Sequence, residues 1–323
     1  MAEWLVEEGI GEHRAIRLEG ETIAEARVQW PGELCAGAVA EAVLISRTAG
    51  SSRGTARFPD GEEALVDRLP PSAAEGSPIR LEVIRPALAE HGRRKLARAR
   101  PTARPPASPV LAEQLRHEGH TARIVRRFPA GDWDELVAEA FAAEVRFSGG
   151  ALQFSPTPAM LLVDIDGTST PRALALAAVL ALAAALRRFD VGGSIGVDFP
   201  TLPAKADRRA VDEALGEALA HWPHERTAMN GFGFVQLVAR LGRPSLLHRA
   251  VFRPAATAAR LLLRRAEALD GAGAILLTGH PVLEAPLTPD ILAQLARRSG
   301  RQVRWDARPA LAVEAPQAQL VPL

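Results

Sequence analysis

The chain has 323 residues, which is enough for about two domains of ordinary size. Its 39 lysines and arginines against 38 acidic residues give a net charge of +1. This balance excludes a basic tail protein and an acidic disordered segment but leaves room for a local basic face. Cys35 is the only cysteine. An internal disulfide and a cysteine-rich zinc site are therefore excluded, and we expect a cytoplasmic protein in a reducing compartment.

Residues 1–100 are predicted to be rich in β-structure. Alternating apolar residues on both sides of Glu19-Gly20-Glu21 predict an N-terminal hairpin within residues 1–35. Between residues 36 and 100, short β-prone runs are separated by glycine- and proline-containing turns, which predicts a small β-barrel. A basic stretch, 93–100, comes next. The proline-rich segment 101–109 is then expected to be a linker between domains.

From residue 109 onward helices and strands are predicted to alternate, which is typical of an α/β fold. The most apolar stretch, 173–186, contains only alanine, leucine and one valine. It is shorter than the roughly 20 residues that a membrane span needs, so we expect a buried helix and no membrane contact. The other helices are expected at 110–118, from 132 onward, and at 205–222, 256–269 and 289–298. Strands are expected at 122–126, 151–154, 160–165, 194–197, 275–277 and 303–305.

Two of the predicted strands end in aspartate. The first reads Leu161-Leu-Val-Asp164-Ile-Asp166-Gly167 and the second reads Ile195-Gly-Val-Asp198-Phe. A strand fixes the position of a carboxylate, and Mg²⁺ prefers a few carboxylate oxygens plus waters, so the pattern is typical of a magnesium site. The alternative is structural, with Asp166 capping the next helix and Asp198 capping a turn. Spacing alone leaves both interpretations open.

Several segments resemble the ribonuclease E/G family, in the order in which that family has them. Residues 141–164 resemble a helix end, a Ser148-Gly149-Gly150 hairpin and the strand that carries the first metal-binding aspartate. Residues 187–199 resemble an arginine-rich helix end, a Gly-Gly turn and a strand ending in Asp-Phe. Asn230-Gly-Phe-Gly-Phe and Arg243-Pro-Ser-Leu resemble two further segments of the family. Residues 1–100 look like its opening hairpin and inserted S1-type barrel.

This resemblance implies an α/β (α+β) fold class with an RNase H-like/DNase I-like catalytic core. Residues 1–35 would pack with 109–147 as the RNase H-like subdomain, and residues 36–100 would form an inserted S1-type OB β-barrel. Residues 148–250 would form the DNase I-like catalytic subdomain with the metal site. Residues 255–323 would form a small C-terminal α/β domain.

The resemblance also implies a Mg²⁺-dependent endoribonuclease that cleaves single-stranded RNA and leaves 5′-phosphate ends, with Mn²⁺ as an alternative ion. Asp164 and Asp198 would bind the metal and, together with Asp166, form the catalytic group. Asp166 stands where the family has an asparagine, so it would either bind the metal directly or orient Asp164. The residues expected to contact RNA are Lys205, Arg209, Arg187, Arg188 and, by base stacking in the barrel, Phe58.

The chain also departs from the family. The family's zinc-binding Cys-x-x-Cys is absent after Ser245, so we expect no structural zinc and a monomer or dimer rather than a zinc-linked tetramer. The interval from Asp164 to Asp198 is shorter than usual, and the family's 5′-phosphate-sensing region is largely missing before Val110. These losses motivate a second hypothesis, a non-catalytic RNA-binding relative. Phe232 and Phe234 are expected in the core, with base stacking as the alternative.

A third hypothesis comes from Asp164-Ile-Asp166-Gly167-Thr168, which is similar to the first motif of haloacid-dehalogenase-type phosphatases. Asp164 would then be a nucleophile, with Thr278 and Lys205 as partners, although the downstream acidic pair of that family is missing. The hypotheses differ in geometry. A phosphatase needs Asp164 to face Thr278, whereas a ribonuclease needs the carboxylates of Asp164 and Asp198 within about 5–6 Å of each other.

Overall fold

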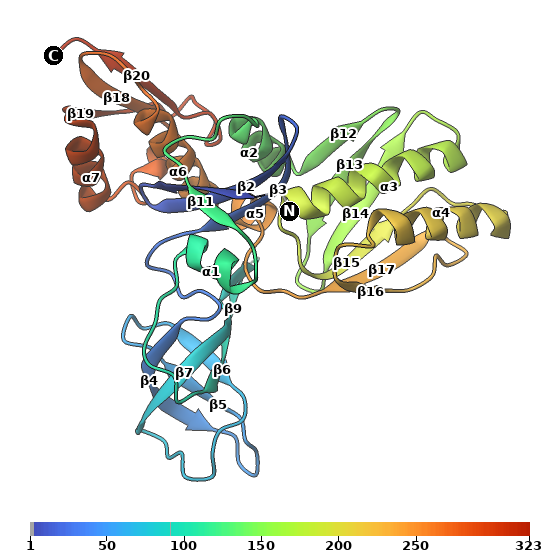
Figure 1. Cartoon of the computed structure of the whole chain (residues 1–323), viewed down its shortest axis with the longest axis horizontal. Helices are drawn as coiled ribbons and strands as arrows, with labels where there is room; N and C mark the ends of the chain where they lie inside the picture. Colours follow the sequence, from blue (N-terminus) through green and yellow to red (C-terminus); the bar gives the residue numbers. More distant parts are fainter. Residues whose placement is uncertain (1–2, 91) are drawn as a thin grey trace.

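A computed structural model describes residues 3–90 and 92–323, and it has a mixed α/β fold. Figure 1 shows a central N-terminal sheet from which a barrel extends in one direction, a six-stranded sheet in a second and a C-terminal module in a third. No helix in the described part of the chain is long and apolar enough to cross a membrane.

The N-terminal sheet joins two distant parts of the sequence. Its strands, in the spatial order β11-β1-β2-β3, are β11 (Ala122–Ile124), β1 (Trp4–Gly9), β2 (Glu12–Glu19) and β3 (Thr22–Gln29). β1 and β11 run parallel, with Trp4 beside Ala122. Helix α1 (Leu111–His117) buries Leu111 and Leu115 against Trp4. The predicted hairpin is therefore part of a larger sheet that residues from beyond the barrel complete.

Five strands form the closed barrel. They are β4 (Val39–Arg47), β5 (Gly54–Arg57), β6 (Glu63–Val66), β7 (Pro78–Arg85) and β10 (Ala97–Pro101). β10 closes the barrel by pairing antiparallel with β7 and parallel with β6. Its sequence alternates, so Ala97 and Ala99 fill the interior while Arg98 and Arg100 point outward. The second half of the basic stretch 93–100 is thus part of the fifth strand of the barrel.

The proline-rich segment expected to be a linker is attached to the barrel. Ala107 forms two backbone hydrogen bonds with Val39, of 2.7 and 2.9 Å, before the chain enters α1. A small hairpin of β8 (Leu88–Glu90) and β9 (Arg93–Lys95) lies at the same end of the barrel and contacts α5 (Leu246–Phe252). The barrel is therefore connected to the rest of the molecule through several segments.

The six-stranded sheet has one covered face and one open face. In spatial order its strands are β12 (Glu144–Phe147), β13 (Gly150–Pro156), β14 (Leu161–Gly167), β15 (Gly193–Asp198), β17 (Phe234–Ala239) and β16 (His224–Arg226). Only the central pair, β14 and β15, runs parallel. Helices α3 (Pro171–Arg188) and α4 (Lys205–Ala218) cover one face (Figure 1). α4 is shorter than predicted, and β12, β16, β17 and α5 were not predicted.

Helix α3 explains the most apolar stretch of the sequence. It packs against β3 of the N-terminal sheet and against β12–β14 of the six-stranded sheet. Leu174, Leu182 and Leu186 are buried in one core together with Ile23 and Val163. A helix that contacts two sheets must be apolar over most of its circumference. The predicted buried helix is therefore confirmed. α2 (Trp133–Ala142) completes this core.

The C-terminal module is a three-stranded sheet with two helices. Its elements are α6 (Pro254–Glu267), β18 (Ala274–Gly279), a short 3-10 turn η1 (Pro281–Leu283), α7 (Pro289–Ser299), β19 (Val303–Ala307) and β20 (Gln317–Val321). β18 is central, parallel to β19 and antiparallel to β20, which was not predicted. Leu262, Ile275 and Leu295 form its core with Ile10 from the N-terminal sheet.

Candidate functional site

Asp164 and Asp198 lie side by side on the open face of the six-stranded sheet. They are register partners in the parallel pair of β14 and β15. Successive side chains of a strand point to opposite faces, and Val163, Ile165 and Val197 are buried beneath α3 and α4. Both aspartates are therefore exposed on the other face, together with Asp166. Neighbouring strands are about 4.8 Å apart, which puts the two carboxylates within reach of one cation.

A row of side chains crosses the sheet at this level. The register pairs Glu144 with Gln153, Gln153 with Asp164, Asp164 with Asp198, and Asp198 with Phe234. At one end of the row the Gln153 amide donates a 2.7 Å hydrogen bond to Glu144. Hydrogen bonds from Arg146 and Gln153 hold the pKa of Glu144 below its usual range. Glu144 is therefore paired with neighbouring side chains, whereas the aspartates of the same sheet are not paired with any described residue.

The three aspartates have no partner of their own. Within residues 3–90 and 92–323, no hydrogen bond or ion pair is made by the side chains of Asp164, Asp166 or Asp198. α3 begins at Pro171, its N-cap residue is Thr170 rather than Asp166, and the Asp198 side chain accepts no backbone N–H from the described residues. The capping interpretation is therefore wrong for both Asp166 and Asp198. Like charges directly opposite one another in a sheet repel, and this repulsion remains uncompensated here.

The carboxylate pair fits a magnesium ion. Mg²⁺ keeps several waters and typically takes one or two protein carboxylates together with substrate phosphate oxygens. Asp164 and Asp198 would supply those two carboxylates. A closed all-protein cage is not formed, because no cluster of three or more His, Cys, Asp or Glu side chains occurs among the described residues. An open, exposed pair leaves room for waters and for a large anionic substrate.

Two unpaired basic side chains lie at the same end of the sheet. The loop 199–204 connects the end of β15 to Lys205, the first residue of α4, and Arg209 follows one turn later. Both are exposed and form no ion pair with another described residue. The neighbouring Arg208 instead donates to the carbonyls of Leu202 and Pro203, at 2.5 and 2.9 Å, and so holds the loop. Lys205 and Arg209 remain available for phosphate.

Arg187 and Arg188 are not brought to this site. Because β14 and β15 are parallel, the helix between them runs back across the sheet, and its C-terminus lies where the strands begin. Arg188 there forms an ion pair with Glu139 of α2, and Arg187 donates to the carbonyl of Ala183. We therefore do not retain these two arginines as RNA contacts beside the aspartates.

The expectation that Phe58 stacks on an RNA base is also wrong. This residue belongs to the barrel core and is only 3% exposed, so its ring presents no face to a base. The phosphatase geometry is not found either. Thr278 lies on β18 in the three-stranded C-terminal sheet, whereas Asp164 lies on β14 in the six-stranded sheet. The two residues do not share a sheet edge, as the phosphatase hypothesis requires.

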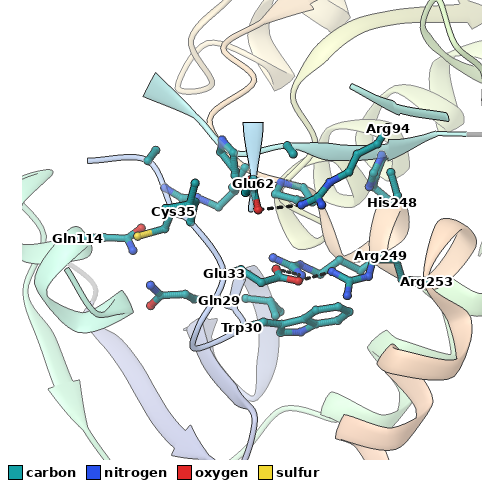
Figure 2. Close-up of a pocket in the computed structure, with 18 of the residues that line it drawn as sticks. Gln29, Trp30, Glu33, Cys35, Glu62, Arg94, Gln114, His248, Arg249 and Arg253 are labelled. Carbon is teal, nitrogen blue, oxygen red and sulfur yellow. Dashed lines mark hydrogen bonds and ion pairs between the residues drawn. The ribbon is translucent and has the colours of Figure 1, made fainter. Parts of the chain in front are cut away.

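A cavity among the described residues lies elsewhere, at the junction of barrel and body. It has a volume of about 320 Å³ and is lined by the segment after β3, by the β8–β9 hairpin and by α5 (Figure 2). Trp30 forms one wall, and the guanidinium groups of Arg249 and Arg253 lie over its ring at 4.1 and 4.6 Å. Arg260 lies over the same ring at 3.7 Å. Glu33 accepts from Arg249 and Arg253, as the dashed lines in Figure 2 show.

The charges of this junction cavity are satisfied internally. Arg94 pairs with Glu62 at 2.8 Å, Arg93 with Glu90 at 2.5 Å, and Arg243 with Glu118 at 3.0 Å. All five arginines in its lining thus have a carboxylate partner.

Burial keeps two titratable groups of the cavity, His248 and Cys35, in their neutral forms. Burial and the nearby Arg249 lower the pKa of His248 to about 4, so this imidazole is neutral at pH 7. Burial raises the pKa of the Cys35 thiol. We therefore assign the cavity a structural role in joining the barrel to the body.

No protein-family model matches the chain, and no curated protein matches it. The function proposed below is therefore inferred from motifs and geometry alone.

The expectation that Phe232 and Phe234 lie in the core is wrong for both residues. Phe234 is half-buried on the open face, as the register partner of Asp198. Phe232 is 82% exposed, in the turn that leads into β17. The signal was present in the sequence, because Gly231 and Gly233 on either side of Phe232 indicate a turn rather than a buried strand.

Proposed function

We propose that the chain is a Mg²⁺-dependent endoribonuclease that hydrolyses phosphodiester bonds of single-stranded RNA and leaves 5′-phosphate ends. The observation that carries this proposal is the register pairing of Asp164 with Asp198 on an open sheet face, with neither carboxylate paired. Two motifs far apart in the sequence, each resembling a metal-binding strand of the ribonuclease E/G family, meet at one point. That coincidence supports the resemblance more strongly than either motif does.

Each residue of the site has a distinct role in this proposal. Asp164 and Asp198 hold the cation, which when bound polarises a phosphoryl oxygen and lowers the pKa of a coordinated water. Asp166 lies on the same face two residues along β14, about 7 Å away, and its proposed role is to bind the metal or to orient Asp164. Lys205 and Arg209 bind backbone phosphates, which positions the strand without reading its sequence.

The architecture is proposed to match the family as well. The barrel pairs its strands as five-stranded Greek-key OB barrels do, with the third and fifth strands parallel. We propose that it is an S1-type RNA-binding barrel and that the two larger sheets correspond to RNase H-like and DNase I-like subdomains. Its outward arginines are engaged, as in Arg57 with Glu63 at 2.7 Å and Arg98 with Asp67 at 2.6 Å. RNA must compete with these pairs, so barrel binding is expected to be weak and salt-sensitive.

The test is cleavage of a fluorogenic single-stranded RNA in the presence of Mg²⁺. Asp164→Asn and Asp198→Asn should each lower the cleavage rate by about 100-fold or more, because each removes a metal ligand. Asp290→Asn is the matched control, since Asp290 is an exposed aspartate in the first turn of α7, in a different sheet module. RNA that binds but is never cut would favour the non-catalytic relative, and unchanged cleavage in both site variants would refute the assignment of the site.

A further inference from the structure

An aromatic ring stands exposed on a rigid turn beside the aspartate pair. The side-chain oxygen of Asn230 accepts hydrogen bonds from the backbone N–H groups of Phe232, at 2.9 Å, and Phe234, at 3.1 Å. Gly233 has φ +94°, and a Cβ there would lie 2.4 Å from the carbonyl oxygen of Phe199. The turn is therefore packed against the residue that directly follows Asp198, and only glycine fits at position 233.

Two further hydrogen bonds fix the same turn to the segment after β15. The N–H of Phe199 donates to the carbonyl of Gly233 at 3.2 Å, and the Thr201 hydroxyl donates to the carbonyl of Phe232 at 3.4 Å. The backbone of Phe232 is therefore held in place on both sides, while its ring is 82% exposed. A fixed backbone presents the ring to a ligand without an additional ordering cost.

A small apolar platform lies on the open face and includes Phe234, which follows this turn. Gly196 of β15 lacks a side chain, and an added Cβ would lie 2.5 Å from the ring of Phe234, 2.9 Å from the Met160 sulfur and 3.0 Å from Leu162. These three side chains thus cover β15 at Gly196, which lies two residues before Asp198. Leu162 is 37% exposed. A single exposed apolar residue is ordinary, but a platform next to bare carboxylates indicates a ligand with flat apolar parts.

The chemistry on this face selects an unpaired nucleotide. Asp164 and Asp198 would hold a divalent cation that could bind the phosphate, and the aromatic ring offers a stacking surface for a base. In a duplex the faces of a base are covered by its neighbours, so only an unpaired base can stack on a protein ring. We propose that Phe232 stacks on an unpaired base next to the scissile phosphate and thereby positions the strand on the carboxylate pair. This inference rests on the proposed ribonuclease function and adds a positioning residue to it.

The experiment measures coupling between Phe232 and one base. The parent protein and Phe232→Ala are compared on a single-stranded RNA and on a series in which one nucleotide near the cleaved bond is abasic. Phe232→Ala should lower kcat/KM on the intact RNA by roughly 5- to 150-fold, the range for loss of one base–aromatic stack. One abasic substrate should lower kcat/KM for the parent by a similar factor and produce no further loss in the variant.

Conservative variants separate stacking from other effects. Phe232→Trp should retain activity, and Phe232→Leu, which is apolar without a π-face, should behave like Phe232→Ala. Leu180→Ala is the matched control, because Leu180 is 71% exposed on α3, on the other side of the sheet. Thermal unfolding should be unchanged for all of them, since both positions are exposed.

The two proposals fail in different ways. A parent that cleaves RNA, combined with Phe232→Ala losses that are the same on every abasic substrate as on intact RNA, overturns the stacking role alone. Full activity of Phe232→Ala does the same. A parent that cleaves no RNA overturns the ribonuclease function and the stacking role with it.

Discussion

The open sheet face and the junction cavity contain the same kinds of charged residue but use them in opposite ways. At the junction, the buried Arg249 and the half-exposed Arg253 share Glu33 above the ring of Trp30. On the open face, Asp164 and Asp198 sit adjacent, and neither they nor Lys205 at the same end of the sheet pair with another described residue. In one region each arginine of the lining has a carboxylate partner, whereas in the other the charged side chains pair with no other described residue.

This difference separates the charged residues that stabilise the fold from those that are available to bind a ligand. Burying a charge is affordable only with a partner, and Arg14 illustrates this, since it is almost fully buried between Glu7 and Glu12. Unpaired charges are tolerated where water solvates them, and there they are free to bind. The cavity is the more obvious pocket, yet the flat face is the better candidate for chemistry.

The largest predicted effect on the contrast between the two regions is the contribution of His248 to the pH dependence of stability. Burial and Arg249 lower its pKa from 6.5 to about 4, so the unfolded chain takes up a proton in a range where the folded chain does not. Stability should therefore fall as pH drops from 6.5 to 4, by up to about 3 kcal/mol from this group. Urea unfolding of the parent and of His248→Gln across this range measures it, because the variant should lack that part of the slope.

The exposed His221 provides the control for this measurement. His221→Gln should leave the pH dependence of the parent intact. Equal slopes for the parent and His248→Gln would show that the junction histidine is solvated, and the junction would then resemble the open face more than we propose.

A smaller loss is expected from Glu33→Gln. Burial alone would raise the pKa of Glu33, but Arg249 and Arg253 outweigh it and lower the pKa below 4.5. The carboxylate thus stabilises the fold above its unfolded pKa, and this contribution is lost as pH falls through the lower folded value. At pH 7 the variant leaves a buried guanidinium short of a partner and should cost about 1–3 kcal/mol of unfolding free energy.

Glu41→Gln is the matched control for Glu33, since Glu41 pairs with Arg80 at 2.7 Å on the exposed barrel surface. Its effect should stay below about 1 kcal/mol. The difference between parent and Glu33→Gln should also shrink below pH 4.5. A Glu33 variant as stable as the Glu41 variant would break the contrast between the two regions.

Part of this arrangement is visible in the sequence. The apolar stretch at 173–186 and the Leu-Val-Asp and Gly-Val-Asp strand ends predict α3, β14 and β15, because hydrophobic periodicity and local composition determine them. The register that sets Asp164 opposite Asp198 depends on long-range pairing of β14 with β15, which no local pattern encodes. The sequence therefore indicates the two residues but not their adjacency.

The errors have the same physical origin. Ala97 to Arg100 looked like a basic stretch, although its alternation is that of a barrel strand with small residues inside. Phe58 was expected to contact RNA because it is the only aromatic residue within 36–100, yet a small barrel needs its large apolar side chain in the core. Arg188 was grouped with the site by motif, whereas the course of α3 places it next to Glu139. Each error concerns which way a side chain faces in three dimensions.

The smallest predicted effect is a gain in stability, opposite to the loss expected for Glu33→Gln, and it concerns Asp198 on the open face. In metal-free buffer Asp198→Asn should raise the free energy of unfolding by about 0.2–1 kcal/mol, because it removes the repulsion between register-paired carboxylates. Adding Mg²⁺ should raise the melting temperature of the parent but not that of the variant, since a ligand stabilises only the folded state that binds it. Asp290→Asn should match the parent in both buffers.

Asp198→Asn should thus gain stability on losing a charge, whereas Glu33→Gln should lose stability. This difference is expected if the Asp198 carboxylate binds a ligand and the Glu33 carboxylate stabilises the fold. Equal stability without metal, or an equal response to Mg²⁺, would mean that Asp198 does not share a cation with Asp164.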